Sequence, residues 1–175
     1  GDVYKRQGQY SQGNQSVSIG YQTGYSNQSI SAIAIGSNSG YFNQNQFGVA
    51  IGGFSGQYSQ GQYSVSVGGY SAQYSQGNYA IALGYQAGYS NQSNYGISIG
   101  ANSAIFTQGA YGISIGYASG QSIQGNYATA LGYQAGQFSQ GQYGIAIGTF
   151  SGLISQNQNS IAIGAFSGQS TQGIY

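Results

Sequence analysis

The sequence predicts an all-β protein, a parallel β-solenoid (β-roll) of about ten to eleven coils with 16 residues each. Three observations lead to this fold class. A glycine recurs every 16 residues without a slip, a short alternation of apolar and small residues precedes each of these glycines, and one glutamine occupies the same place in every repeat. We expect residues 8–175 to form a single repeat domain.

The alternation before each glycine predicts a β-strand. Ala32-Ile33-Ala34-Ile35-Gly36 is typical, with aliphatic side chains two residues apart and only Ser, Ala or Gly between them. A period of two is the pattern of a strand, whereas a helix needs a period near 3.6 and is weakened by this much Gly and Ser. The closing glycines are Gly20, Gly36, Gly52, Gly68, Gly84, Gly100, Gly116, Gly132, Gly148 and Gly164.

The aliphatic column is the predicted core, because large apolar residues are usually the buried ones. Aromatic residues two positions earlier fall on the same side of the strand, so we expect an aromatic ladder beside that core. The predicted core is Ile19, Ile33, Ile35, Val49, Ile51, Val65, Val67, Ile81, Leu83, Ile97, Ile99, Ile113, Ile115, Leu131, Ile145, Ile147, Ile161 and Ile163. The predicted aromatic ladder is Phe47, Tyr63, Tyr79, Tyr95, Tyr111, Tyr127 and Tyr143.

Two further positions in each repeat are small or turn-forming, as at Gly88 and Gly77. Together with the closing glycine they give three candidate corners in each coil, where the chain needs residues that tolerate unusual dihedral angles. A second short strand lies between two of these corners.

The glutamine column has no exception, whereas its neighbours vary. Parallel in-register coils bring equivalent side chains to about 4.8 Å, within reach of hydrogen bonds between successive amides. We therefore expect an inward-facing ladder; the alternative is an exposed glutamine repeated by gene duplication. The column is Gln12, Gln28, Gln44, Gln60, Gln76, Gln92, Gln108, Gln124, Gln140, Gln156 and Gln172.

The small residues between the aliphatic positions would then form a flat outer face. Such a face can approach a sister chain closely, as in stacked silk-like sheets; the alternative is that small residues merely suit a regular coil. The interface candidates are Ala34, Ala50, Ser66, Ala82, Ser98, Ser114, Ala130, Ala146 and Ala162.

The composition argues against an enzyme. The chain has two Lys or Arg residues, one Asp, and no Glu, His or Cys, so it lacks a general acid–base pair and a usable set of metal ligands. We expect no cofactor and no catalytic or metal site. So few basic residues also argue against nucleic-acid binding, and the short apolar runs argue against a membrane-spanning helix.

All three charged residues lie within residues 1–7. The segment Asp2-Val3-Tyr4-Lys5-Arg6-Gln7 looks like the translation of a transposon end used in preparing DNA sequencing libraries. We expect a non-native scar there, the alternative being a genuine short basic N-terminus, and we expect residues 8–175 to be a fragment of a longer chain.

The repeat core resembles a known family. Ser16-Val17-Ser18-Ile19-Gly20 and Ser160-Ile161-Ala162-Ile163-Gly164 are similar to the repeats of YadA-like heads in trimeric autotransporter adhesins. Gly84-Tyr85-Gln86-Ala87-Gly88 is similar to repeats of some tail-fibre proteins. The resemblance implies a left-handed parallel β-roll, often trimeric, that serves as a fibre or adhesive head on a cell surface or virion. The longer period and the missing charges set this chain apart from those heads.

We therefore expect a structural, non-catalytic segment of an extracellular fibre, adhesin head or tail-fibre shaft. Its partners would be sister chains, in a trimer, another homo-oligomer or a filament, and an unidentified surface receptor. One alternative is an ice-binding solenoid, although its Thr residues do not form a column. A second alternative is an amyloid-like extracellular matrix protein, which the Gln, Tyr, Gly and Ser content fits.

Overall fold

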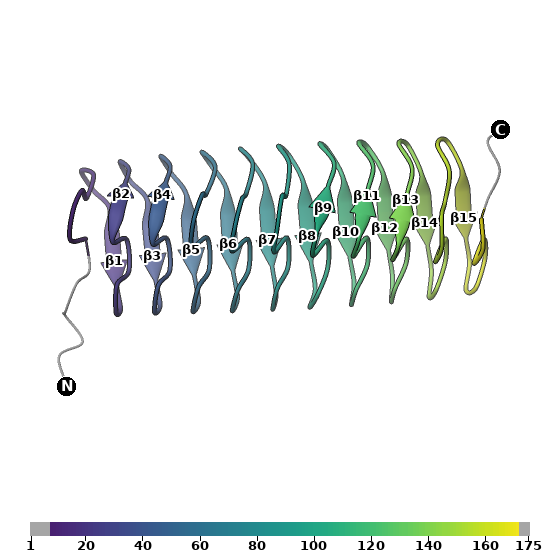
Figure 1. Cartoon of the computed structure of the whole chain (residues 1–175), viewed down its shortest axis with the longest axis horizontal. Coiled ribbons are helices and arrows are strands. Elements are labelled where there is room, and N and C mark those ends of the chain that lie inside the picture. Colours follow the sequence, from purple (N-terminus) through teal and green to yellow (C-terminus); the bar gives the residue numbers. More distant parts are fainter. Residues whose placement is uncertain (1–7, 172–175) are drawn as a thin grey trace.

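The computed structural model describes residues 8–171, so the predictions for residues 1–7 and for Gln172 lie outside it. The described chain is all-β and winds into a straight stack of parallel coils that repeat every 16 residues (Figure 1). The sequence-based prediction of a parallel β-solenoid is confirmed.

One ten-stranded parallel sheet runs along the whole stack, and we call it the main sheet. Each strand pairs with the equivalent strand of the next coil, for example with Ala82 opposite Ser98. Its strands are β1 (Val17–Ile19), β3 (Ile33–Ile35), β5 (Val49–Ile51), β6 (Val65–Val67), β7 (Ile81–Leu83), β8 (Ile97–Ile99), β10 (Ile113–Ile115), β12 (Thr129–Leu131), β14 (Ile145–Ile147) and β15 (Ile161–Ile163).

The opposite wall carries the second short strand that the sequence predicts. Regular strand pairing is present there only in some coils, and elsewhere single parallel bridges join successive glutamines, such as Gln76 and Gln92. The strands of this wall are β2 (Ser26–Gln28), β4 (Phe42–Gln44), β9 (Thr107–Gln108), β11 (Ile123–Gln124) and β13 (Ser139–Gln140).

The closing glycines from Gly20 to Gly148 form a corner at which a side chain would meet the backbone of the next coil. Gly100 has a φ of +120°, and a Cβ added to it would lie 2.6 Å from the carbonyl oxygen of Gly116 in the next coil. Because backbone lies against backbone at this corner, a side chain has no space there. The unbroken glycine column therefore reflects coil-to-coil contact.

The space between the two walls is narrow, and the side chains of the main sheet therefore point in the opposite directions to those predicted. Ala82 is fully buried, and a Cβ built on Gly88 of the facing wall would lie 3.3 Å from the Ala82 methyl group. A space that narrow holds a methyl or a hydroxyl group but no branched side chain. The usual rule that large apolar residues are buried does not hold in this sheet, since there is no room to bury them.

The predicted aliphatic core is consequently wrong, because these residues point outward. Five of them are exposed, with Ile163 the most exposed at 64 %: Ile19, Ile51, Leu131, Ile161 and Ile163. The others are half-buried by their neighbours along the sheet: Ile33, Ile35, Val49, Val65, Val67, Ile81, Leu83, Ile97, Ile99, Ile113, Ile115, Ile145 and Ile147.

The predicted flat outer face is wrong for the same reason. Its residues fill the interior, with at most 2 % of their surface exposed, so they are not available to a sister chain. They are Ala34, Ala50, Ser66, Ala82, Ser98, Ser114, Ala130, Ala146 and Ala162.

The predicted aromatic ladder is present, but its rings lie on the outside of the solenoid, at the turn before each strand of the main sheet. Seven rings stack in one column from Phe47 to Tyr143, with centroid distances between 4.8 and 5.3 Å. Each is exposed, and each has a left-handed backbone, as at Tyr95 with a φ of +59°. Stacking with the rings above and below accompanies this uncommon conformation.

Candidate functional site

The glutamine ladder is the interior's main polar element, and its predicted inward direction is confirmed. Nine successive members are buried, with at most 4 % of their surface exposed. Only Gln12, in the first described coil, is exposed. The buried members are Gln28, Gln44, Gln60, Gln76, Gln92, Gln108, Gln124, Gln140 and Gln156.

Each buried glutamine amide joins two walls of the coil through hydrogen bonds. The Nε2 of Gln92 donates to the carbonyl oxygens of Ile81 at 2.7 Å and Gly96 at 3.0 Å. The same pair of acceptors, 11 residues before and 4 residues after the glutamine, recurs from Gln28 to Gln156. Glutamine is needed because its side chain spans the thin interior and still carries a donor for backbone carbonyls.

Direct bonds between amides form only part of the ladder. They join Gln28 to Gln44, Gln76 to Gln92, Gln108 to Gln124 and Gln124 to Gln140, with N–O distances of 3.1 to 3.2 Å. In some coils a serine of the main sheet also donates to the amide oxygen, as Ser114 does to Gln124 at 2.8 Å.

Four buried amide oxygens have no hydrogen-bond partner among residues 8–171. Two of them, in Gln60 and Gln156, have an alanine at the position from which Ser114 donates to Gln124. These two oxygens therefore lack a serine donor, and the glutamine of the preceding coil does not donate to them either, whereas Gln44 has Ala34 at that position and accepts from Gln28.

A third inner column, which the sequence analysis missed, consists of buried serines. Ser39, Ser55 and Ser71 donate to main-sheet carbonyls of the next coil at 2.8 to 2.9 Å. The signal in the sequence is a position with only Ser, Thr or Ala before each corner, for instance Ser71 before Ala72. These hydroxyl groups hold successive coils together from within.

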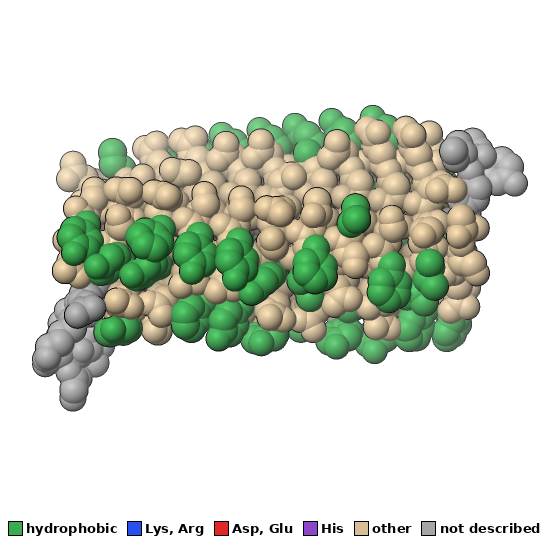
Figure 2. Space-filling model, viewed as in Figure 1, with side chains coloured by type: hydrophobic (Ala, Val, Ile, Leu, Met, Phe, Trp, Pro, Cys, Tyr) green, Lys and Arg blue, Asp and Glu red, His purple; other side chains and the backbone are tan. Residues whose placement is uncertain are grey.

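The outer surface of the main sheet is apolar, and we call it the apolar face. It comprises the outward aliphatic columns of the main sheet, and we include in it the exposed aromatic ladder at the turn before each strand. Figure 2, viewed from the side of the opposite wall, shows that hydrophobic side chains form rows along that side of the stack as well, and no charged side chain of the described residues lies in view. The regular 16-residue register makes the apolar face flat and repetitive over ten strands.

The phenol of Tyr89 has a raised pKa. A hydrogen bond with the Tyr74 hydroxyl, followed by desolvation, raises the pKa of Tyr89 to about 12. The rings of Tyr74 and Tyr89 meet edge to face at 5.1 Å. A phenol that resists ionisation in this way is a poor general base near neutral pH.

No group of three or more His, Cys, Asp and Glu residues occurs between residues 8 and 171. In the same part of the chain no helix has the length and hydropathy needed to cross a bilayer. The side chains that the solenoid offers to other molecules are therefore phenols, primary amides, hydroxyls and aliphatic groups.

Comparison with known proteins adds no relative. No protein-family model matches the chain, and neither a curated protein nor a solved structure does.

Proposed function

We propose that the solenoid is a structural, non-catalytic rod, a segment of an extracellular fibre, adhesin head or tail-fibre shaft, that associates with sister chains. The observation that carries this proposal is the exposed apolar face. The chain has no charged residue past Arg6, so no charge repulsion opposes contact between the flat apolar strips of two copies. The extracellular, cell-surface or virion location is supported by the likeness of the repeat core to adhesin heads.

The area of the apolar face supports pairing of two copies. Ten strands at about 4.8 Å give a length near 48 Å, and three outward columns give a width of about 13 Å. Face-to-face packing would bury roughly 1,200 Å² in total, which is the lower end for specific interfaces. Other exposed apolar residues, such as Tyr74 and Phe106 on the opposite wall, could provide further contacts between copies. The apolar face alone is sufficient for a dimer, which is the smallest assembly that covers it.

Sedimentation velocity on the whole chain tests this proposal. We expect a dimer, and we expect the double variant Ile97→Lys/Ile113→Lys to be monomeric yet folded, because both side chains point outward and are only half-buried. The matched control is Ser59→Lys/Ser75→Lys, which adds the same charge at exposed positions of the opposite wall. A native chain that stays strictly monomeric, or a control that dissociates equally, contradicts the proposal.

Ice binding is a second candidate that the same face supports. Its side chains form straight columns on a flat sheet, and such a regular surface can order water. Thermal hysteresis of the native chain, lost in Ile97→Lys/Ile113→Lys, would favour this candidate over self-association, and its absence would eliminate it. The amyloid-like alternative has less support, since the parallel pairing lies within one chain.

A further inference from the structure

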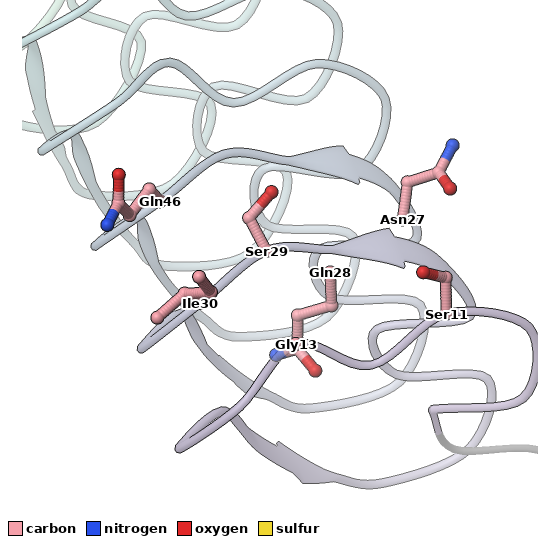
Figure 3. A pocket seen from close by; sticks show the side chains of 7 residues that line it. All are labelled: Ser11, Gly13, Asn27, Gln28, Ser29, Ile30 and Gln46. Atoms are coloured by element: carbon pink, nitrogen blue, oxygen red, sulfur yellow. The ribbon is translucent and has the colours of Figure 1, made fainter.

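A polar groove crosses the first coils on the corner that precedes the main sheet (Figure 3). Two hollows of about 360 and 380 Å³ share Ser29 and Gln46, so they form one continuous depression. The first extends to Ser11 and the second to Asn78, so the groove crosses five successive coils, about 19 Å at ~4.8 Å per coil. Both hollows are open to solvent, so they suit a ligand that lies along the surface of the rod.

The groove has hydrogen-bonding groups that the fold leaves unused. Gln62 donates through its backbone N–H to Asn78 Oδ1 at 2.8 Å and through Nε2 to Gln46 Oε1 at 3.3 Å, which holds the row of amides in place. The remaining amide atoms, Nε2 of Gln46, Oε1 of Gln62 and Nδ2 of Asn78, make no hydrogen bond among residues 8–171, and neither do the Ser29 hydroxyl and the Asn45 amide. Donors and acceptors thus alternate along the groove.

The chemistry of these groups selects the ligand class. The groove contains no charge, so it offers an ionised ligand no counter-charge. Backbone groups of the coils already pair with the next coil, as Tyr63 N does with Gln46 O, so this corner offers no free strand edge to an extended peptide. Sugar hydroxyls, which both donate and accept, match the mixed amide and hydroxyl lining.

We propose that this groove binds an uncharged, extended polysaccharide that lies along the solenoid axis. A groove that runs along the axis with amides at Gln46, Gln62 and Asn78, one on each of three successive coils, suits a ligand that is itself a linear repeat. Several weak contacts along one chain would add through high effective concentration. This binding does not depend on self-association, because the groove and the apolar face are formed by different residues.

Titration of the whole, isotope-labelled chain with cellohexaose, an uncharged β-1,4 glucan, tests the proposal by NMR. Maltohexaose, which curls because of its α linkages, and the anionic hexagalacturonate serve as comparators. We expect cellohexaose to cause chemical-shift changes confined to the groove, and both comparators to cause much weaker changes. Sedimentation of the same samples reports self-association separately, so failure of one proposal is distinguishable from failure of the other.

A matched pair of double variants locates the site. Gln46→Ala/Asn78→Ala removes two amides of the groove and should weaken binding at least about fivefold, as expected for two lost hydrogen bonds. Asn126→Ala/Gln142→Ala removes amides from the same column outside the groove, including the equivalent bond from Ala110 N to Asn126 Oδ1, and should leave binding unchanged. Equal weakening by both variants, absence of shifts with millimolar cellohexaose, or equal binding of either comparator would overturn the proposal.

Discussion

Replacement of Gln92 by leucine should destabilise the solenoid far more than the same change on its surface. Gln92 donates to the carbonyl oxygens of Ile81 and Gly96 and to Ser98 Oγ at 3.2 Å, and it accepts from Gln76. Because Nε2 carries only two N–H groups, these four contacts amount to about three full hydrogen bonds, and at about 0.5–1.5 kcal/mol for each their loss costs about 1.5–4.5 kcal/mol. Leucine fills a similar volume, so the added apolar burial offsets part of this cost.

Urea unfolding followed by circular dichroism measures the effect. We expect the free energy of unfolding to fall by about 2–4 kcal/mol in Gln92→Leu. The control is Gln86→Leu, because the Gln86 amide makes no hydrogen bond among residues 8–171 and should change stability by less than about 0.5 kcal/mol. If both variants unfold at the native midpoint, the buried amides are not what joins the walls and the reasoning fails.

Three other results are expected. Ala146→Ser should raise stability by about 0.5–1.5 kcal/mol, because its hydroxyl would reach the unpaired Gln156 Oε1 as Ser114 reaches Gln124; an unchanged urea midpoint would refute this. Gly100→Ala should lower the melting temperature sharply, since its Cβ would meet backbone at 2.6 Å; a shift of less than about 2 °C would contradict the corner geometry. Stability should be nearly flat from mildly acidic to mildly basic pH, since residues 8–171 contain no Asp, Glu, Lys, Arg or His. Because the folded pKa of Tyr89, about 12, exceeds its ordinary value of 10.0, its contribution is complete below pH 10.0 and is lost as the pH rises toward 12. The urea midpoint, measured at a series of pH values, checks this profile, and a steep fall in stability at acidic pH would contradict it.

Periodicity was sufficient to predict the coil, the corners and the register. The 16-residue spacing places Ala82 opposite Ser98 and Gln76 beside Gln92, and the structure has both pairs. The constant glutamine column also indicated burial correctly. These features depend only on which residues recur, and recurrence is visible in the sequence.

The direction of the side chains could not be read from the same pattern. Strict alternation says that Ile81 and Ala82 lie on opposite sides, but it does not say which side is inside. That choice depends on the distance between the two walls of a coil. The corner glycines and the hydrogen bonds of Gln92 hold the walls close together, and the space between them is too small for an isoleucine side chain. The polar groove was also missed, because its residues come from five coils and vary in type.

The thiol reactivity of single cysteine variants tests most directly which side chains of the main sheet face the interior of the solenoid. The chain has no cysteine of its own, so Ile81→Cys and Ala82→Cys each introduce one thiol at neighbouring positions of β7. We expect a maleimide to modify the thiol at position 81, which is half-buried, in the folded protein and to leave position 82, which is buried, unmodified until urea unfolds the protein. Fast reaction at position 82 with protection at position 81 would mean that the aliphatic residues form the core after all.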